Sequence, residues 1–436
     1  MKIERLMLVN FRGIRGMDLE FNEKLTVLIG PNGAGKSSIL HAMALPLSDL
    51  FKQPPYWEKE KNSGVKNSDI LNGESSAEVE VFLKSHGKSD CADFELALCR
   101  DESQRVDGTA TSDLKKSPLV VEMEYGLRRD QKVSGSLLAV RYLPERHLGN
   151  AHAGRVGGIM APKSAYSSAL YCGRGHRQFF RWFRMMQNAD SQSLQVPWAQ
   201  ALEMLKNGER PLGTNPHLHA ARESICDFMH ARALHYDVGE DTFFVYKDKQ
   251  ALSVNQLSDG EKALLALVGD LTYRLSVTHP HLTGSDELLQ KAEAVVMIDE
   301  MEAHLHPAWQ RMVVPRLLET FPNVQFIITT HSPQVLGEIK SENIVMLEDA
   351  PQGIQHYRFS REVHGMASSH ILEALMGTPE RAEDVKDAVK KAYLAIERNE
   401  TEEAKELLAK LSQDAKDIPE LERIAMGIRR KEAVGK

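Results

Sequence analysis

The sequence predicts an α/β fold in which a mixed sheet flanked by helices surrounds a phosphate-binding loop. Three observations support this prediction. A complete Gly-x-x-x-x-Gly-Lys-Ser pattern spans residues 30–37, an apolar strand at 294–298 is followed by two acids, and a β-branched strand at 324–330 is followed by a histidine. In open α/β sheets, ligands bind beyond the carboxyl ends of the strands. We therefore expect the three segments to meet at one edge of the sheet.

The loop at 30–37 has the strand–loop–helix context that phosphate binding requires. An apolar run at 25–29 predicts the strand before the loop, and residues 38–42 continue as a helix. Glycines let backbone N–H groups approach phosphates, and the helix N-terminus adds partial positive charge. We expect Lys36 to reach the β- and γ-phosphates and the Ser37 hydroxyl to ligate Mg²⁺. The other nucleotide-binding candidates are Asn32, Gly33 and Gly35 in this motif and Ser38 directly after it.

A helix N-terminus provides a second candidate anion site. Residues 257–262 have the sequence Leu-Ser-Asp-Gly-Glu-Lys and open a helix predicted to run through Arg274. Ser and Asp are favoured N-cap residues, and the N–H groups that follow a cap are free to bind an anion. Alone, the hexapeptide would predict only a capped helix. Its place between the other motifs favours phosphate contacts from Ser258 and Gly260.

The acidic strand end predicts the catalytic groups. Asp299 is expected to hold Mg²⁺, and Glu300 to polarise the attacking water. His331 follows the next buried strand and is expected to contact the γ-phosphate at the same sheet edge. His304 and His306 lie between these strands, two residues apart. Because no third ligand stands at a recognisable spacing, we favour hydrogen-bonding roles for them over a metal site.

Two basic features leave alternatives open. Arg12 lies in the turn at 10–14, where it is either a nucleotide contact or a solvated turn residue. The segment 176–184 has the sequence His-Arg-Gln-Phe-Phe-Arg-Trp-Phe-Arg. Interleaved basic and aromatic residues can bind nucleic acid. Helical spacing favours instead a lid helix whose aromatic residues divide between the core and a subunit contact.

Composition and charge limit the class of protein. The 436 residues are 42% hydrophobic and 26% charged, as in soluble globular chains of two or three domains. A net charge of −7 argues against a uniformly basic surface but leaves a local basic groove open. No apolar run approaches the roughly 20 residues of a membrane helix, and no secretory signal is evident. The four cysteines form no Cys-x-x-Cys pair, which fits a reducing compartment. We expect a cytoplasmic protein with no membrane contact.

The order of the motifs predicts one nucleotide-binding head that is split in sequence. Residues 1–47 and 240–350 are expected to form its two lobes. Residues 48–239 are expected to be an insertion of a small β-subdomain and a helical lid, and residues 351–436 a helical tail for docking or oligomerisation. The strands predicted for the β-subdomain lie at 77–84, 94–100, 119–125 and 136–143. The helices predicted for the tail begin at Pro379, Thr401 and Pro419.

Taken together, these motifs resemble the ATP-binding-cassette (ABC) ATPase superfamily. The matching segments are Gly30–Ser37 (Walker A), Leu257–Lys262 (signature), Val295–Glu300 (Walker B) and His331 (switch histidine). The Asn-Phe-Arg-Gly at 10–13 and the His-Leu-His-Pro at 304–307 resemble the RecF/SMC/OLD-like branch. Within that branch, the signature, the Thr-Thr-His-Ser-Pro-Gln at 329–334 and the Pro-Glu-Leu at 419–421 resemble the PtuA family of Septu and some retron antiphage systems.

The resemblance implies an ABC-type ATPase head that binds ATP and Mg²⁺ between two subunits of a homo-oligomer. It also implies a separate HNH nuclease partner similar to PtuB. Asp259 stands where many members of the superfamily have glycine, and no glutamine switch loop is evident before the signature. No acidic nuclease set follows Ile344, so we expect no nuclease centre in this chain. The alternatives are a RecF-like repair ATPase, for which DNA is the partner, and a transporter subunit.

Overall fold

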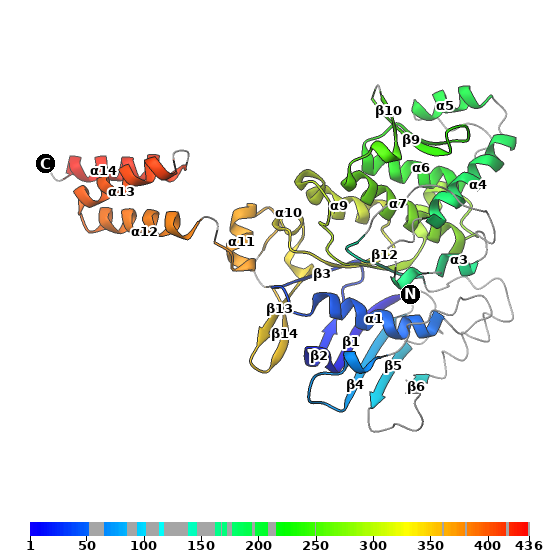
Figure 1. The fold of residues 1–436 in the computed structure, drawn as a ribbon, viewed down its shortest axis with the longest axis horizontal. Coiled ribbons are helices and arrows are strands. Elements are labelled where there is room, and N and C mark those ends of the chain that lie inside the picture. The colour runs from blue at the N-terminus through cyan, green and yellow to red at the C-terminus, as the bar shows by residue number, and fades with distance from the viewer. Residues whose placement is uncertain are drawn as a thin grey trace. The chain divides into compact units, whose positions relative to one another are not determined.

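The computed structural model divides into two compact units, Met1–Gly365 and Met366–Lys436, and each is described by itself (Figure 1). It describes residues 1–51, 65–84, 94–101, 113–116, 138–145, 162–166, 168–171, 177–193, 197–207, 215–248, 250–359, 362–379, 382–415 and 418–434. Across these ranges, no helix has the length and apolarity needed to cross a bilayer.

The first unit is built on a six-stranded sheet with the order β14-β13-β3-β12-β11-β7. Its strands are β3 (Leu25–Ile29), β7 (Ala139–Tyr142), β11 (Ala294–Ile298), β12 (Val324–Thr329), β13 (Ile344–Ala350) and β14 (Gly353–Arg358). The strands from β13 to β7 pair in parallel, and β14 pairs antiparallel with β13. Every residue of β3, β11 and β12 is buried, as in parallel strands covered on both faces. The predicted mixed sheet is confirmed.

A second, antiparallel sheet has the order β2-β1-β4-β5-β6. Its strands are β1 (Lys2–Phe11), β2 (Ile14–Glu20), β4 (Ser76–Lys84), β5 (Phe94–Asp101) and β6 (Asp113–Lys116). This corrects the expected separate β-subdomain, because β4 pairs directly with β1 and β7 pairs in parallel with β11. Such pairings join distant segments, which the local pattern of a strand does not identify. The strand predicted at 119–125 lies outside the described residues.

Helices and a small sheet complete the first unit. The sheet is antiparallel and contains β8 (Ala233–Asp237), β9 (Thr242–Lys247) and β10 (Gln250–Ser253). The helices are α1 (Lys36–Phe51), α3 (Pro162–Tyr166), α4 (Arg177–Ser193), α5 (Trp198–Lys206), α6 (Pro216–Met229), α7 (Asp259–Thr278), α8 (Ser285–Lys291), α9 (Pro307–Thr320) and α10 (Pro333–Leu336). Helix α7 is buried from Ala263 to Thr278, so the predicted signature helix is a central element of this unit.

The aromatic residues of α4 belong to the core. Phe179, Phe180, Trp182 and Phe183 are each at most 2% exposed. Helix α4 packs closely on α7, because a Cβ added at Gly269 would lie 2.7 Å from the ring of Phe179. These rings are therefore not available to stack on bases. All four lie in the core, so none of them is exposed for the subunit contact that we expected some of them to make.

A buried polar network joins α7 to the edge strand β7. The Tyr142 hydroxyl donates to Asp270 Oδ2 at 3.0 Å, and Arg274 Nε donates to the same oxygen at 2.6 Å. Both side chains of the Asp270–Arg274 ion pair are fully buried. The backbone carbonyl of Tyr142 accepts the N–H of Asp299 at 2.9 Å. One residue of β7 thus contacts both the acidic strand end and α7.

The second unit is helical. It contains α11 (Ser368–Met376), α12 (Glu383–Glu397), α13 (Thr401–Asp414) and α14 (Glu420–Val434). Its core is formed by Ala392, Ala395, Ile396, Ala404, Leu411, Ile424 and Ile428. The first predicted tail helix begins at Glu383 and not at Pro379. Because β14 continues the six-stranded sheet to Arg358, the head extends past residue 350, where we expected it to end.

Candidate functional site

The phosphate-binding loop encloses its own lysine. Lys36 is 7% exposed, and its Nζ donates to the carbonyl oxygens of Gly30 and Pro31, each at 2.9 Å. A Cβ at Gly30 would lie 2.3 Å from the carbonyl oxygen of Leu347 in β13. Only glycine fits at this close approach. Gly33 and Gly35 both have φ near +86°, while Asn32 and Ser37 are exposed. The loop therefore has a backbone shape that favours glycine at both positions, and it leads directly into α1 at Lys36.

The geometry of Ser37 and Asp299 fits a magnesium ion. The Ser37 hydroxyl donates to Asp299 Oδ1 at 3.0 Å, although the two residues are 262 positions apart. Octahedral Mg²⁺ has ligands at about 2.0–2.1 Å, so two adjacent ligand oxygens stand about 3 Å apart. A hydroxyl oxygen and a carboxylate oxygen at this separation are spaced as two adjacent ligands of the ion would be. Mg²⁺ also prefers these hard oxygen ligands.

Thr329 orders the two acids at the end of β11. Its hydroxyl donates to Asp299 Oδ1 at 2.7 Å and accepts the backbone N–H of Glu300 at 2.8 Å. Glu300 has φ of +47°, a left-handed conformation that costs a residue with a side chain about 1 kcal/mol or more. Its side chain is exposed. The structure thus holds the expected base in a constrained backbone position with its carboxylate open to solvent.

Glu302 is a third carboxylate at this edge, and our sequence reasoning gave it no role. It accepts the backbone N–H of His331 at 2.6 Å and the hydroxyl of Thr330 at 2.7 Å. Burial lowers the pKa of His331, and the charge of Lys36 lowers that pKa further, so the neutral imidazole is favoured. The sequence signals that could have identified these contacts were the two adjacent threonines before His331 and the acid two residues after Glu300.

The predicted phosphate-binding and catalytic residues lie together. Burial is the main cause that lowers the pKa of Lys36, and the charges of Asp299, Glu302 and Glu300 oppose that shift. The same three acids also act on His331. Strand β7 ends beside them, since Tyr142 is the register partner of Ile298. Residues 143–145 therefore leave the sheet at the same edge, in a position that our sequence analysis did not recognise.

The signature helix packs against the turn that follows the acids. The Ser258 hydroxyl caps α7 by accepting the N–H of Glu261 at 3.3 Å, and Glu261 accepts the N–H of Ser258 at 2.8 Å. This reciprocal pair is a capping box. Gly260 is buried, and a Cβ there would lie 2.6 Å from the carbonyl oxygen of His304 and 3.2 Å from the ring of Trp309. The signature and the Walker B turn therefore touch within one chain.

We expect Gly260→Ala to displace the start of α7. The added methyl would meet a backbone carbonyl, which has little freedom to move, and overpacking of this kind costs about 1–3 kcal/mol. A decrease in urea midpoint, measured by tryptophan fluorescence, checks this expectation. Gly16→Ala is the matched control, because nothing lies within 4 Å of its added Cβ. An unchanged midpoint for Gly260→Ala would show that the turn yields freely.

Arg12 and His306, which the sequence analysis also singled out, have hydrogen-bond partners outside this group. Arg12 Nε donates to Asp69 Oδ1 at 2.9 Å, and its backbone N–H donates to the Asp69 carbonyl at 2.7 Å. For Arg12 to contact a nucleotide, its ion pair with Asp69 would have to open, or the guanidinium would have to bind both groups at once. His306 caps α9 by accepting the N–H of Ala308 at 3.3 Å. Among the described residues, no three His, Cys, Asp or Glu side chains form a metal-binding group.

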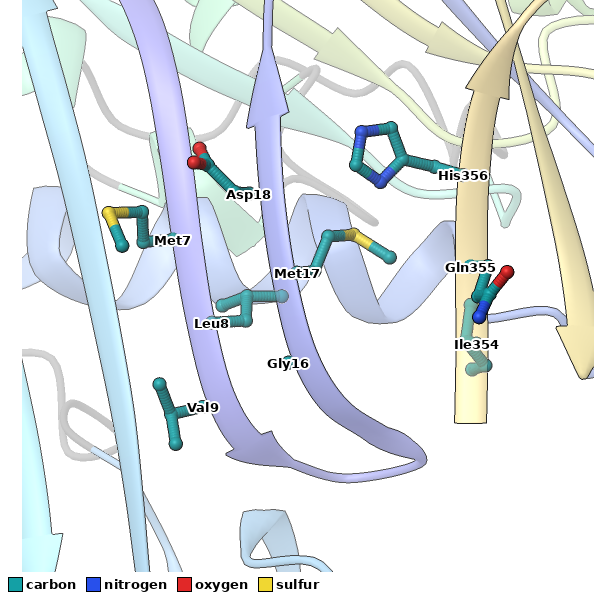
Figure 2. Close-up of a pocket in the computed structure, with 9 residues that line it drawn as sticks. All are labelled: Met7, Leu8, Val9, Gly16, Met17, Asp18, Ile354, Gln355 and His356. Atoms are coloured by element: carbon teal, nitrogen blue, oxygen red, sulfur yellow. The ribbon is translucent and has the colours of Figure 1, made fainter. Parts of the chain in front are cut away.

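A separate groove of about 510 Å³ lies between β1–β2 and β14 (Figure 2). Its walls are mainly apolar, with Asp18, Gln355 and His356 as the polar side chains. The complete lining is Met7, Leu8, Val9, Gly16, Met17, Asp18, Ile354, Gln355 and His356. None of these is a predicted site residue, although the Ile354 side chain also lies against Gly35 of the loop, 3.0 Å from where a Cβ of that glycine would be.

Comparisons with known proteins agree with these motifs. The family described as "AAA ATPase domain" matches residues 1–117, and the family described as "AAA domain, putative AbiEii toxin, Type IV TA system" matches residues 202–337. The retron Ec83 probable ATPase of Escherichia coli is 26% identical, over 95% of this chain and 84% of that protein. The Septu protein PtuA of Bacillus thuringiensis is 21% identical, over 87% of this chain and 85% of its own length.

A second PtuA, from Bacillus mycoides, is 26% identical over 80% of this chain and 40% of that protein. These likenesses cover both lobes of the head, where the Walker motifs, the signature and the switch histidine stand in the expected order. The chain is an ABC-type ATPase of the RecF/SMC/OLD-like branch. In this ABC-type ATPase, the parallel sheet brings the Walker A and Walker B residues and His331 to one edge.

Proposed function

We propose that this ABC-type ATPase is the ATP-binding and hydrolysing subunit of a bacterial antiphage defence complex. In this proposal it forms an ATP-switched oligomer that scaffolds and regulates a separate HNH nuclease. The observation that carries the proposal is the gathering of Lys36, Ser37, Asp299, Glu300 and His331 at one sheet edge. Similarity to the retron ATPase and the two PtuA proteins supports the defence role.

Each residue has a distinct chemical task in this proposal. Lys36 turns from its two carbonyl partners towards the β- and γ-phosphates. Ser37 and Asp299 would hold Mg²⁺, which neutralises phosphate charge when it is bound. Glu300 accepts a proton from the attacking water, and the neutral imidazole of His331 hydrogen-bonds the γ-phosphate. Positive groups and N–H donors around the transferring phosphoryl group stabilise its transition state.

A second copy of the chain would complete the site. Ser258 is exposed and caps the start of α7 within its own chain. The N-terminus of a helix favours an anion. We propose that Ser258 and this helix N-terminus close over the γ-phosphate held by the other copy. ATP binding would then make the dimer and hydrolysis would release it, which is a switch able to gate a partner.

The helical second unit is the proposed docking element for oligomerisation or for the nuclease. It has its own core, and the Met426 side chain on α14 is 65% exposed. In this proposal the head binds ATP and closes the dimer, and the second unit adds a separate surface that binds protein.

Native mass spectrometry of the chain co-expressed with its genomic neighbours tests the proposal. We expect a small nuclease to co-purify, the mass to change with ATP, and DNA cleavage to depend on nucleotide. A chain that purifies alone, forms dimers with ATP and hydrolyses faster with DNA would favour a RecF-like repair role. A chain that binds no ATP would contradict both.

A further inference from the structure

The first turn of α9 contacts both the signature and the residue that follows the switch histidine. In the proposed dimer, these two elements of one copy would lie at different nucleotides. On one side, the ring of Trp309 packs over Gly260 of the signature, 3.2 Å from where its Cβ would be. On the other side, the next residue, Gln310, reaches Ser332, which directly follows His331. The start of α9 therefore lies between the signature and the switch histidine.

Gln310 makes two hydrogen bonds in series. Its Oε1 accepts the hydroxyl of Ser332 at 2.6 Å, and its Nε2 donates to the carbonyl oxygen of Leu305 at 2.8 Å. Ser332 and Leu305 are almost fully buried, at 4% and 7% exposure. A side-chain amide that joins two buried groups transmits a displacement of either group to the other, since breaking either bond leaves a buried polar group without that partner.

Each end of this link is held by a residue that is next in sequence to one of the residues through which the coupling would pass. At one end, Ser332 follows His331, whose backbone N–H is held by Glu302. At the other end, Leu305 follows His304, whose carbonyl oxygen stands against the Cα of Gly260 at a distance that leaves no space for a methyl group. A movement of His331 towards a γ-phosphate would therefore pull on the turn that seats the signature helix.

We propose that Gln310 is a positioning residue that couples the switch histidine to the signature helix. In the proposed dimer, detection of the γ-phosphate by His331 of one copy sets the position of Ser258 at the nucleotide of the other copy. This inference rests on the proposed function, because it needs two nucleotides shared between two copies. It assigns the coupling to one side chain that contacts neither nucleotide.

The test compares the ATP dependence of hydrolysis in the wild type, Gln310→Met and Gln310→Glu. Methionine has a similar shape and makes neither hydrogen bond. Glutamate keeps the acceptor for Ser332 and loses the donor to Leu305. We expect a wild-type Hill coefficient above 1, with two as the limit for two sites. Both variants should give a Hill coefficient near 1 and an ATP affinity within about threefold of wild type, since neither removes a nucleotide contact.

Gln334→Met is the matched control. The Oε1 of Gln334 also accepts the Ser332 hydroxyl, at 3.0 Å, and its other described bond is a backbone one at the start of α10. This variant should keep the wild-type Hill coefficient, since it leaves the link to Leu305 intact.

Three outcomes would overturn the inference or its basis. A cooperative wild type with equally cooperative Gln310 variants would show that the coupling does not pass through Gln310. Equal losses in Gln310→Met and Gln334→Met would assign the effect to the Ser332 hydroxyl alone. A wild type that hydrolyses ATP without cooperativity and forms no dimer with ATP would contradict the proposed function as well. This outcome distinguishes failure of the proposed function from failure of the Gln310 inference alone.

Discussion

Glu300→Gln is expected to abolish turnover while ATP remains bound. The substitution preserves size but removes the group that accepts a proton from water, and loss of a general base costs about 10²–10⁴-fold in rate. The backbone N–H at residue 300 would still donate to Thr329 Oγ1, so the unusual local conformation should persist. We expect the variant to accumulate as a closed dimer with ATP, because hydrolysis no longer releases it.

Steady-state hydrolysis and light scattering with and without ATP measure the two effects. Glu319→Gln is the control, since it removes one exposed carboxylate near the end of α9. If Glu300→Gln hydrolysed ATP at the wild-type rate, Glu300 would not be the base. A slow variant that stayed monomeric with ATP would keep the catalytic assignment and contradict the ATP-driven dimer.

Lys36→Ala is expected to abolish nucleotide binding. In the structure, its Nζ donates to two carbonyl oxygens of the loop, and we expect it to leave them for the β- and γ-phosphates. Hydrogen bonds to charged groups contribute about 1.5–3 kcal/mol each, so loss of two weakens ATP binding by roughly 10²–10⁴-fold.

Titration calorimetry with ATP and Mg²⁺ checks this prediction. Lys24→Ala is a suitable control, because Lys24 is an exposed lysine immediately before β3. An affinity for Lys36→Ala within tenfold of wild type would mean that the phosphates bind elsewhere. Thermal unfolding of the variant without nucleotide separates a loss of binding from a loss of structure.

The elements that could be predicted from sequence are those whose signal is local. The Walker A loop needs a strand, glycines and a helix start within 13 residues, from Leu25 to Ser37, and the structure has each in place. The strand at 294–298 was predicted because a continuous apolar run indicates a strand buried on both faces. The helices of the second unit followed from their apolar periodicity, although the start of the first one differed by four residues.

Pairing partners could not be predicted in the same way. Strand β4 has the alternating pattern of any half-buried strand, and that pattern is compatible with a separate subdomain or with an extension of β1. The hydrogen bonds that decide between them join residues about 75 positions apart. The same holds for β7, whose place beside β11 brings residues 143–145 to the catalytic edge.

The sequence by itself predicted a phosphate-binding loop with Lys36 and Ser37, and two acids after a buried strand. These features depend on residue types at short spacing, and a complete motif of this kind is recognisable from the residues alone. Only the tertiary structure decided that Thr329 and Glu302 hold the acids and the switch histidine, and that Gln310 joins that histidine to the signature turn. Those contacts depend on which strand ends become neighbours, and that choice is made by the packing of the whole head.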